Sequence, residues 1–497
     1  MDVQEMELTD DRDLHEIESV LHEVIALRES IATDDLVRTL QDDPAARGPG
    51  VANLAHYLAL RRHDPRNLQR KLMRLGLSSL GRLEGRVLPT LDAVIFALSA
   101  MAGRQSPHPL QEEKAFFAGE ERLKQASDAL FGPARGRRRT RIMVTLPSEA
   151  AADPDLVLGF ARAGMNVARI NCAHDDSSVW EAMVANVRAA EKAAGQHLAV
   201  FMDIAGPKIR TEQVAQHDKG EKLKAGDKLR LVSEGPLETG KHMPVAASLS
   251  LPELIGRIKT GDRVLYDDAK LEGIVVEANG TEAIVRVLRT KTGGVKIKPE
   301  KGLNFPDTRL DLAALTKEDE DDLSAVIKLA DIVGYSFVED AADIDLLEAA
   351  LVRHGIGERP LGLVAKIERP DAVTNLPSII ARTAGRRPFG VMIARGDLAS
   401  EIGFERLAEM QEEILWICEA ASVPAIWATQ VLEDLVKEGV PSRGEMTDAA
   451  MSARAECVML NKGASQQVAV ELLDRLLERM DSHIFKKTPI LRPLKSW

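Results

Sequence analysis

From Arg141 onward, short apolar segments alternate with amphipathic ones, which is the pattern of repeated βα units. Eight strands are predicted, in the order RIMVTL, NVARIN, LAVFMDI, DIVGYSF, LGLVAKI, GVMIAR, PAIWATQ and CVMLN. Helical periodicity predicts the helices between them, as in DPDLVLGFARAG, SSVWEAMVANVRAAEKAAG and ERLAEMQEEILWICEAA. Eight strands in this order predict an α/β chain folded as a (β/α)8 TIM barrel.

Residues 211–302 interrupt this alternation. They contain segments such as EKLKAGDKLRLV, LEGIVVEANG and TEAIVRVLR, which read as strands separated by Gly, Asp and Asn turns. We expect a small all-β domain inserted after the third barrel strand. Because an insertion at the carboxyl end of a barrel strand lies over the barrel mouth, it is expected to act as a lid. A purely structural insertion is the alternative.

Residues 1–137 are predicted to form a helical accessory domain ending in a basic linker, since segments such as LHEIESVLHEVIALRESI carry apolar residues at helical spacing. The linker ARGRRRTR, Ala134 to Arg141, is either a solvated connection or a site for an anionic partner. The predicted barrel then comprises residues 138–210 and 303–485, and residues 486–497 form a carboxyl-terminal tail.

The composition describes a water-soluble protein. The net charge of −12 argues against nucleic acid as the main partner, although a local cationic pocket is compatible with it. The cysteines Cys172, Cys418 and Cys457 lie far apart and suit reduced thiols of a cytoplasmic protein. The acidic amino terminus does not resemble a signal peptide, and no apolar run approaches the roughly 20 residues that span a bilayer. We therefore expect a cytoplasmic protein without a membrane partner.

Polar residues gather where the predicted strands end. Lys366 and Glu368 project to the same side of the fifth strand, because strand side chains alternate between faces. Glu368 and Asp397 are candidate Mg²⁺ ligands, since Mg²⁺ needs one or two carboxylates completed by substrate oxygens and water. Arginine and lysine at the other strand ends suit a phosphate group: Arg169, Arg210 and Lys366. The set predicts a Mg²⁺-dependent site for a small phosphorylated carboxylic acid, with a purely structural ion-pair cluster as the alternative.

Seven motifs carry a resemblance to a known family. From about Arg141 to Ser482 the chain resembles pyruvate kinases, through MNVARINCAHD, DIAGPKIRT, KGLNFP, LVAKIERPDAV, ARGDLASEI, WATQVLE and PSRGEMTDAA in family order. The predicted inserted domain also falls where that family has its lid. The resemblance implies phosphoryl transfer from phosphoenolpyruvate to ADP, giving pyruvate and ATP, with Mg²⁺ or Mn²⁺ as cofactor.

The resemblance also implies roles for individual residues. Lys366 would stabilise the transferring phosphoryl group and the enolate, Arg169 would contact phosphate, and Glu368 with Asp397 would bind Mg²⁺. Three residues would hold the substrate near its carboxylate, with the last also near the proton donor: Gly396, Asp397 and Thr429. Four others match positions around the nucleotide and the monovalent cation: Thr145, Asn171, His174 and Arg210.

The chain departs from potassium-dependent members of the family. Of the four potassium ligands, Asn171 and Asp203 are kept, whereas Ala173 and Ile204 replace the other two. Lys208 stands where potassium-dependent members have glutamate. Members that need no K⁺ resemble this chain in having lysine there. We therefore expect Lys208 to supply the missing positive charge near a remnant cation site, and K⁺ not to be required.

Other departures concern the nucleotide and the ends of the chain. Asn461, Lys462 and Gly463 replace a Ser-Gly-Glu sequence after the eighth strand, and the first strand ends one residue short of the family pattern. The family's usual carboxyl-terminal domain is expected to be absent. We expect a homo-oligomer. Two alternatives to an active kinase remain: a regulatory relative that binds phosphoenolpyruvate without turnover, and a different barrel enzyme that uses its enolate.

Overall fold

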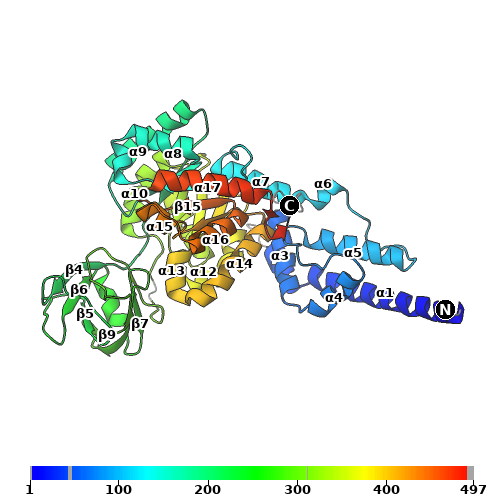
Figure 1. Cartoon of the computed structure of the whole chain (residues 1–497), viewed down its shortest axis with the longest axis horizontal. Helices are drawn as coiled ribbons and strands as arrows, with labels where there is room; N and C mark the ends of the chain where they lie inside the picture. Colours follow the sequence, from blue (N-terminus) through cyan, green and yellow to red (C-terminus); the bar gives the residue numbers. More distant parts are fainter. Residues whose placement is uncertain (1–2, 43–47, 310–311, 490–497) are drawn as a thin grey trace.

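Eight parallel strands close into a barrel in which sequence neighbours lie side by side and the last strand pairs with the first (Figure 1). The computed structural model describes residues 3–42, 48–309 and 312–489. The barrel strands are β1 (Arg141–Thr145), β2 (Val167–Asn171), β3 (Ala199–Asp203), β11 (Ile332–Tyr335), β12 (Gly362–Ile367), β13 (Phe389–Ala394), β14 (Ala425–Ala428) and β15 (Cys457–Leu460). All eight predicted strands are confirmed, as is the barrel fold.

Helices surround the barrel and connect its strands. They are α8 (Pro154–Ala163), α9 (Ser177–Ala194), α10 (Lys317–Leu329), α11 (Ala341–Arg353), α12 (Pro370–Thr383), α13 (Arg395–Ile402), α14 (Phe404–Ala421), α15 (Glu433–Glu438), α16 (Arg443–Met451) and α17 (Gln466–Asp481). After α17 a short hairpin follows, β16 (Ile484–Phe485) and β17 (Thr488–Pro489). Residues 490–497 of the predicted tail lie outside the described part of the chain.

Several of these helices begin where the sequence supplies a capping residue. Helix α10 starts after Thr316, whose hydroxyl accepts a hydrogen bond from the Asp319 amide while the Asp319 carboxylate accepts one from the Thr316 amide. This reciprocal pair satisfies two of the amide groups that a helix start leaves without partners. Asp340 caps α11 in the same way, and Ser442 caps α16.

Alternation along the strands divides the barrel interior into an apolar and a polar layer. The apolar cluster contains at least one side chain from every barrel strand, for example Met143, Val167, Phe201 and Val364. Two residues further along β12, the same inward face carries Lys366. The interior is therefore packed with hydrocarbon at the amino end of the strands and lined with polar groups at the carboxyl end.

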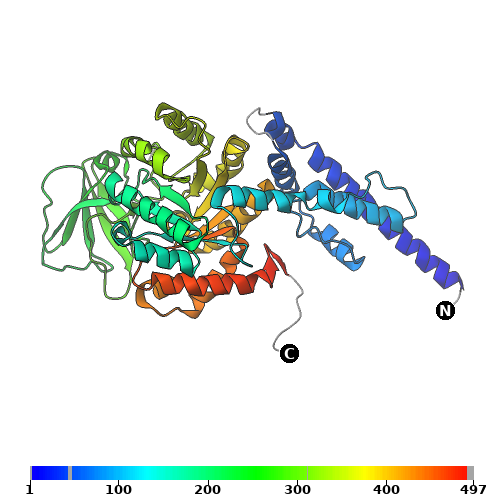
Figure 2. The same cartoon turned by 90° about the horizontal axis from the view of Figure 1, so that it is seen from above.

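The inserted β domain leaves the barrel after β3 and returns before α10, and it lies on the opposite side of the barrel from the amino-terminal helices (Figures 1 and 2). Its strands are β4 (Thr211–Gln216), β5 (Lys228–Val232), β6 (Val245–Leu249), β7 (Arg263–Tyr266), β8 (Leu271–Ala278), β9 (Glu282–Thr290) and β10 (Leu303–Asn304). They form one sheet with its own hydrophobic cluster. A bridge between Arg210 and Gly302 joins the two connecting segments at its base.

The amino-terminal region is helical, as predicted. Its helices are α1 (Val3–Ala32), α2 (Asp35–Asp42), α3 (Pro49–Arg61), α4 (Arg66–Arg74), α5 (Val87–Met101), α6 (Glu113–Phe116) and α7 (Ala118–Phe131). Helix α3 packs closely on the end of α14, because a Cβ on Gly50 would lie 2.2 Å from the Ala421 carbonyl oxygen. Buried Asn53 adds hydrogen bonds to the carbonyl oxygens of Glu84 (2.6 Å) and Ala420 (2.8 Å).

Helix α7 closes the amino end of the barrel. Leu130 and Phe131, its last residues, belong to the same hydrophobic cluster as the inward side chains of the strands. Leu130 occupies space left by two strand glycines: a Cβ on Gly362 would lie 2.7 Å from one of its methyl carbons, and a Cβ on Gly390 would lie 2.6 Å from the other. The amino-terminal helices therefore complete the core of the barrel.

No helix within the described ranges is long and apolar enough to cross a membrane. The three cysteines are buried and free, as the sequence predicts. Burial raises the pKa of the Cys172 thiol well above its usual range.

We expect Leu130→Ala to lower the free energy of unfolding by roughly 2–4 kcal/mol, because it opens a cavity where α7 meets the strands. Denaturant titration followed by tryptophan fluorescence measures the change. Leu110→Ala, at a position that is 57% exposed, is the matched control and should change stability by less than about 0.5 kcal/mol. Equal losses in the two variants would mean that Leu130 does not contribute to the barrel core.

Candidate functional site

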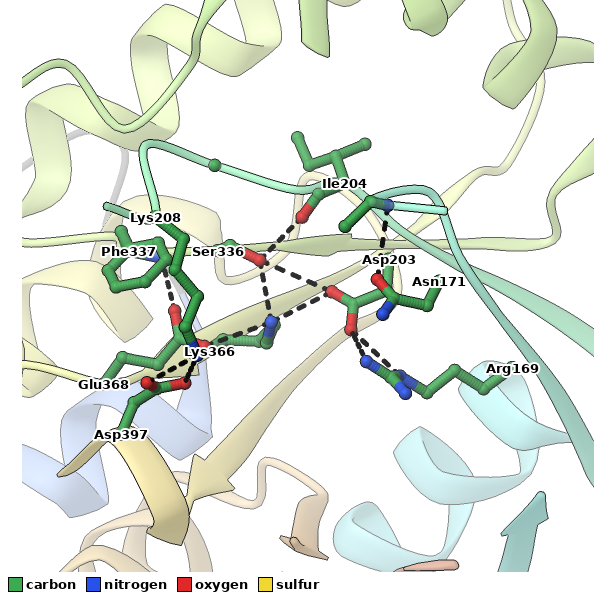
Figure 3. A network of polar contacts seen from close by, with 12 residues as sticks. Arg169, Asn171, Asp203, Ile204, Lys208, Ser336, Phe337, Lys366, Glu368 and Asp397 are labelled. Carbon is green, nitrogen blue, oxygen red and sulfur yellow. Dashed lines mark hydrogen bonds and ion pairs between the residues drawn. The ribbon is translucent and has the colours of Figure 1, made fainter. Parts of the chain in front are cut away.

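A polar cluster occupies the carboxyl end of the barrel, directly above the apolar interior (Figure 3). It is built from the ends of neighbouring strands and the loops that follow them, and its members are Arg169, Asp203, Lys208, Ser336, Lys366, Glu368 and Asp397. Six of the seven are predicted site residues; Ser336 is not. Active sites of such barrels lie at this end of the strands, so the location fits a catalytic site.

Lys366 is the centre of the cluster. Its ammonium lies 3.1 Å from an Asp203 oxygen, 3.1 Å from a Glu368 oxygen and 2.7 Å from the Ser336 hydroxyl. The residue is only 9% exposed. Burial disfavours the charged ammonium, but the two carboxylates outweigh it and raise the pKa of Lys366. A fixed positive charge is therefore held at the barrel mouth.

Asp203 is shared between two cations. One oxygen faces Lys366, and the other accepts hydrogen bonds from the Arg169 guanidinium, with the Arg169 Nε at 2.9 Å. Burial alone would raise the pKa of Asp203, yet Lys366 and Arg169 together lower it. Gly334 makes room for this arrangement on β11, since a Cβ there would meet the Phe201 ring at 2.4 Å.

Glu368 and Asp397 are two nearby carboxylates with different partners. The second Glu368 oxygen accepts a 2.6 Å hydrogen bond from the Phe337 amide. Both Asp397 oxygens contact the Lys208 ammonium, at 2.7 and 3.0 Å. Burial, opposed by Lys366 and reinforced by the charge of Asp397, raises the pKa of Glu368. Lys208 overcomes the cost of burial and lowers the pKa of Asp397.

This pair fits a magnesium ion. Within the described ranges no group of three or more His, Cys, Asp or Glu side chains is arranged to hold a metal, so the set is limited to two carboxylates. Mg²⁺ commonly uses one or two carboxylates and completes its shell with substrate oxygens and water. Burial is the main cause of the raised pKa of Glu368, and the charge of Asp397 adds to it; a divalent cation held by both carboxylates would relieve that repulsion.

The two predicted ligands of the remnant monovalent-cation site, Asn171 and Asp203, are both engaged by protein groups. Both Asp203 oxygens already face cations, and the Asn171 side-chain oxygen accepts a 3.3 Å hydrogen bond from the Ala173 amide. Ile204 adds an apolar side chain. Lys208, expected to supply positive charge near this site, forms its hydrogen bonds with Asp397 rather than with Asp203 or Asn171. The segment after β3 carries Lys208 across the mouth towards α13 (Figure 3).

The loop after β14 is strained beside Asp397. Thr429 and Gln430 have φ angles of 67° and 56°, a region in which β-branched residues are rare. The Thr429 hydroxyl accepts a 2.8 Å hydrogen bond from the Gly396 amide. Arg395 holds the loop, donating to the Thr429 carbonyl at 2.7 Å and to Asp448 at 2.9 Å. The predicted residues Gly396, Asp397 and Thr429 therefore lie together.

The predicted nucleotide residues are less closely grouped. Burial, together with the charges of Lys462 and Arg210, lowers the pKa of His174, so these cations lie near the imidazole. Thr145 is buried instead, and its hydroxyl accepts a 3.0 Å hydrogen bond from Arg169. Buried Gln466 ties the loops after β1 and β15 by donating to the carbonyl oxygens of Thr145 (2.8 Å) and Asn461 (3.0 Å).

A cavity of about 590 Å³ lies beside these two loops. Pro147 and Ser148 line it from the β1 side, and Lys462 and Gly463 line it from the β15 side. Lys462 therefore lines this cavity and is also one of the cations that lower the pKa of His174.

The sequence interpretation missed Ser336 and the Phe337 amide, which fix Lys366 and Glu368. Ser336 is the second-last residue of the predicted strand DIVGYSF and lies on its inward face, so the rule that selected the other strand-end residues would have found it. Phe337 has a φ of 56° and contributes its backbone amide. Its residue type therefore gives no indication of this role.

The inserted domain reaches the rim of this site. Asn304, in β10, donates a 3.0 Å hydrogen bond to Glu401 of α13, the helix that carries Asp397. Lys208 lies only two residues before Arg210, where the connecting segments of the domain pair. The inserted domain is therefore linked to the two segments that carry Lys208 and Asp397.

Comparisons with known proteins relate the barrel region of the chain to one family. The family model "Pyruvate kinase, barrel domain" matches residues 137–468. The chain is 31% identical to a pyruvate kinase of Mycobacterium intracellulare, covering 71% of this chain and 72% of that protein, and 32% identical to one of Agrobacterium vitis, covering 72% of each. For a Geobacillus stearothermophilus pyruvate kinase the identity is 32%, over 67% of this chain but only 55% of that protein.

A solved structure is also similar. The crystal structure of a pyruvate kinase from Cryptosporidium parvum matches with a TM-score of 0.61 and 28% sequence identity, covering 72% of this chain and 73% of that one. The residues matched by the family model, 137–468, include most of the chain that the sequence motifs mark.

We expect Lys208→Met to bind Mn²⁺ at least tenfold more tightly in the absence of other ligands. The ammonium of Lys208 now competes with a divalent ion for both Asp397 oxygens, and tenfold corresponds to about 1.4 kcal/mol. Electron paramagnetic resonance of free Mn²⁺ measures the affinity. Lys270→Met, which removes a lysine paired with Asp267 in the inserted domain, is the control and should leave it unchanged. Weaker binding by Lys208→Met would contradict this competition.

Proposed function

Because this chain belongs to the pyruvate kinase family, we propose that it transfers a phosphoryl group from phosphoenolpyruvate to ADP, giving pyruvate and ATP. The observation that carries the proposal is the buried, charged Lys366 at the barrel mouth, held between Asp203, Glu368 and Ser336. Phosphoryl transfer needs positioning and charge neutralisation more than a covalent nucleophile, and a fixed cation beside two carboxylates suits that requirement.

Lys366 and Arg169 have different roles at the donor, phosphoenolpyruvate. Lys366 stabilises the migrating phosphoryl group and then the enolate oxygen that its departure leaves behind. Arg169 contacts the phosphate from the neighbouring strand, and Asp203 keeps both cations in place. Because these side chains are already fixed by protein contacts, little reorganisation is needed when the phosphorus–oxygen bond of the donor breaks.

Mg²⁺ is the proposed cofactor, with Mn²⁺ as a substitute. Glu368 and Asp397 would hold it, and when bound it would neutralise phosphoryl and carboxylate oxygens of the substrate. Lys208 contacts both Asp397 oxygens, so an ion held by Asp397 would compete with this ammonium, and a displaced Lys208 would be available to the anionic substrate. The substrate carboxylate would lie at the Gly396 amide and Thr429, and Thr429 would lie near the group that protonates the enolate carbon.

The acceptor would enter from the side of β1, β2 and β15. Arg210 and Lys462 supply positive charge there for the phosphates of ADP, and the imidazole of His174, whose pKa is lowered by burial and by these cations, is a neutral hydrogen-bonding group beside them. The loops that Gln466 ties together border the nearby cavity. Lys462 stands where the family pattern has no basic residue, so this positive charge on the acceptor side is a departure of this chain from the pattern. The three buried, reduced thiols suit a cytoplasmic location.

Potassium independence is part of the proposal. The Asp203 carboxylate, which would coordinate K⁺, is paired with Lys366 and Arg169, the Ile204 side chain offers no ligand, and the Ile204 carbonyl oxygen already accepts a hydrogen bond from Ser336. Lys208 adds one further permanent positive charge within the site. At about 4 Å and an effective dielectric near 20, one unit charge contributes roughly 4 kcal/mol, enough to decide whether the site is active.

We expect Lys366→Met to lower kcat at least 10³-fold, equivalent to about 4 kcal/mol of transition-state stabilisation. A lactate dehydrogenase-coupled assay with phosphoenolpyruvate, ADP and Mg²⁺ measures turnover, and circular dichroism with thermal melting checks the fold. Lys270→Met is the control and should keep wild-type kcat. Near-normal turnover by a folded Lys366→Met variant would remove the central assignment. Binding of phosphoenolpyruvate without turnover in the unmodified protein would favour the regulatory alternative, and phosphate release without ATP the other barrel enzyme.

We expect activity without added K⁺ in tetramethylammonium buffers, and a loss of at least tenfold for Lys208→Glu, which reverses a charge beside Asp397. Adding K⁺ to Lys208→Glu tests whether the lost charge can be replaced. A strict K⁺ requirement in the unmodified protein would refute the proposed role of Lys208.

A further inference from the structure

The basic linker, residues 134–141, has no place in the proposed reaction, but the structure separates its arginines into two groups. Four of them bond inward and serve the fold. Arg135 donates to the Ala161 carbonyl, Arg138 pairs with Asp474, Arg139 with Asp481 and Arg141 with Asp128. Within the described ranges Arg137 forms no such ion pair or side-chain hydrogen bond, and it is exposed.

Arg137 faces a cavity of about 830 Å³ that two further arginines line. Arg475 and Arg479 come from the last two turns of α17, and in the described part of the chain neither guanidinium has an ion-pair partner. The remaining lining residues are Glu478, Asp481, Ser482 and His483. Segments more than 330 residues apart thus bring three guanidinium groups to one cavity.

The charges in this cavity are unbalanced. Asp481 is already neutralised by the Arg139 side chain and by an Arg139 amide hydrogen bond of 2.5 Å. Glu478 is then the remaining lining carboxylate against three arginines. Arg475 and Arg479 are also four residues apart on one helix, and like charges at this spacing destabilise a helix by a few tenths of a kcal/mol. An anion in the cavity would remove this repulsion.

We propose that Arg137, Arg475 and Arg479 form a second anion site, which binds a small metabolite through a phosphate or diphosphate group. The planar guanidinium fork matches phosphate oxygens in a bidentate manner, and three forks match a doubly phosphorylated or pyrophosphate group better than a single carboxylate. The serine and histidine beside them add polar contacts for the rest of the ligand.

This site lies at the opposite end of the barrel from Lys366, because Arg137 precedes β1 and α17 ends before the carboxyl-terminal hairpin. Helix α17 joins the two ends, running from the side of the inserted domain towards the amino-terminal helices (Figures 1 and 2). Its 16 residues span about 24 Å. Gln466, its first residue, holds the loops after β1 and β15, so an anion that pulls on Arg475 and Arg479 acts on the acceptor side of the site. This coupling rests on the proposed function, whereas the binding does not.

Isothermal titration with pyrophosphate, in EDTA and at constant ionic strength, tests the binding. We expect the full chain to bind pyrophosphate at least tenfold more tightly than inorganic phosphate. The triple variant Arg137→Gln, Arg475→Gln, Arg479→Gln should lose this event while keeping any weaker binding at the catalytic end. The control variant Arg70→Gln, Arg82→Gln, Lys114→Gln removes the same number of exposed positive charges from the amino-terminal helices and should bind as the unmodified protein does.

Unchanged pyrophosphate binding in the triple variant, or an equal loss in the control, would overturn the proposal. Hydrogen exchange gives a second measure, because pyrophosphate should protect residues 475–483 in the unmodified protein but not in the triple variant. For the coupling, inorganic phosphate should change the KM for ADP at least twofold more in the unmodified protein than in the triple variant. Equal changes would reject the route through α17. Since the titration involves no turnover, an inactive protein would refute the proposed function and leave the anion site standing.

Discussion

A buried ammonium surrounded by carboxylates decides how the mouth of this barrel is organised. Removing a charged amine from water costs several kcal/mol unless it is paired, so Lys366 requires Asp203 and Glu368 close by. Those carboxylates are buried as well and need partners of their own, which Arg169 and the Phe337 amide provide. Each polar group at this end of the barrel is therefore explained by the desolvation of another.

The same need for charge balance explains why Lys208 lies across the barrel mouth, next to Asp397. Asp397 would face Glu368 without a cation, and the two negative charges would repel each other at a place with little water. Lys208 supplies the balancing charge from a segment that also leads into the inserted domain. Lys208 thus balances the charge of Asp397 and also lies in the segment that connects the barrel to the inserted domain.

Regular patterns in the sequence were enough to predict the eight strands, the inserted sheet and the amino-terminal helices, because each is encoded by local periodicity. The strand-end rule also identified most of the polar cluster. What it could not predict was the partner of Lys208, which depends on the path of an irregular loop, or the hydrogen bond from the Phe337 amide, which depends on an unusual backbone angle. The packing of Leu130 into the barrel escaped for a related reason. A leucine at the end of an amphipathic helix does not reveal which neighbouring core it enters.

The position of Leu130 decides whether the amino-terminal helices and the barrel can be treated as separate domains. The amino-terminal helices are not a separable module, because Leu130 of α7 fills part of the barrel interior and its removal would open that interior to water. The two glycines that receive Leu130 lie on barrel strands, so the barrel is shaped to its plug at these points. Removing α7 would therefore expose the apolar interior of the barrel at its amino end, so the barrel and the amino-terminal helices form one folding unit.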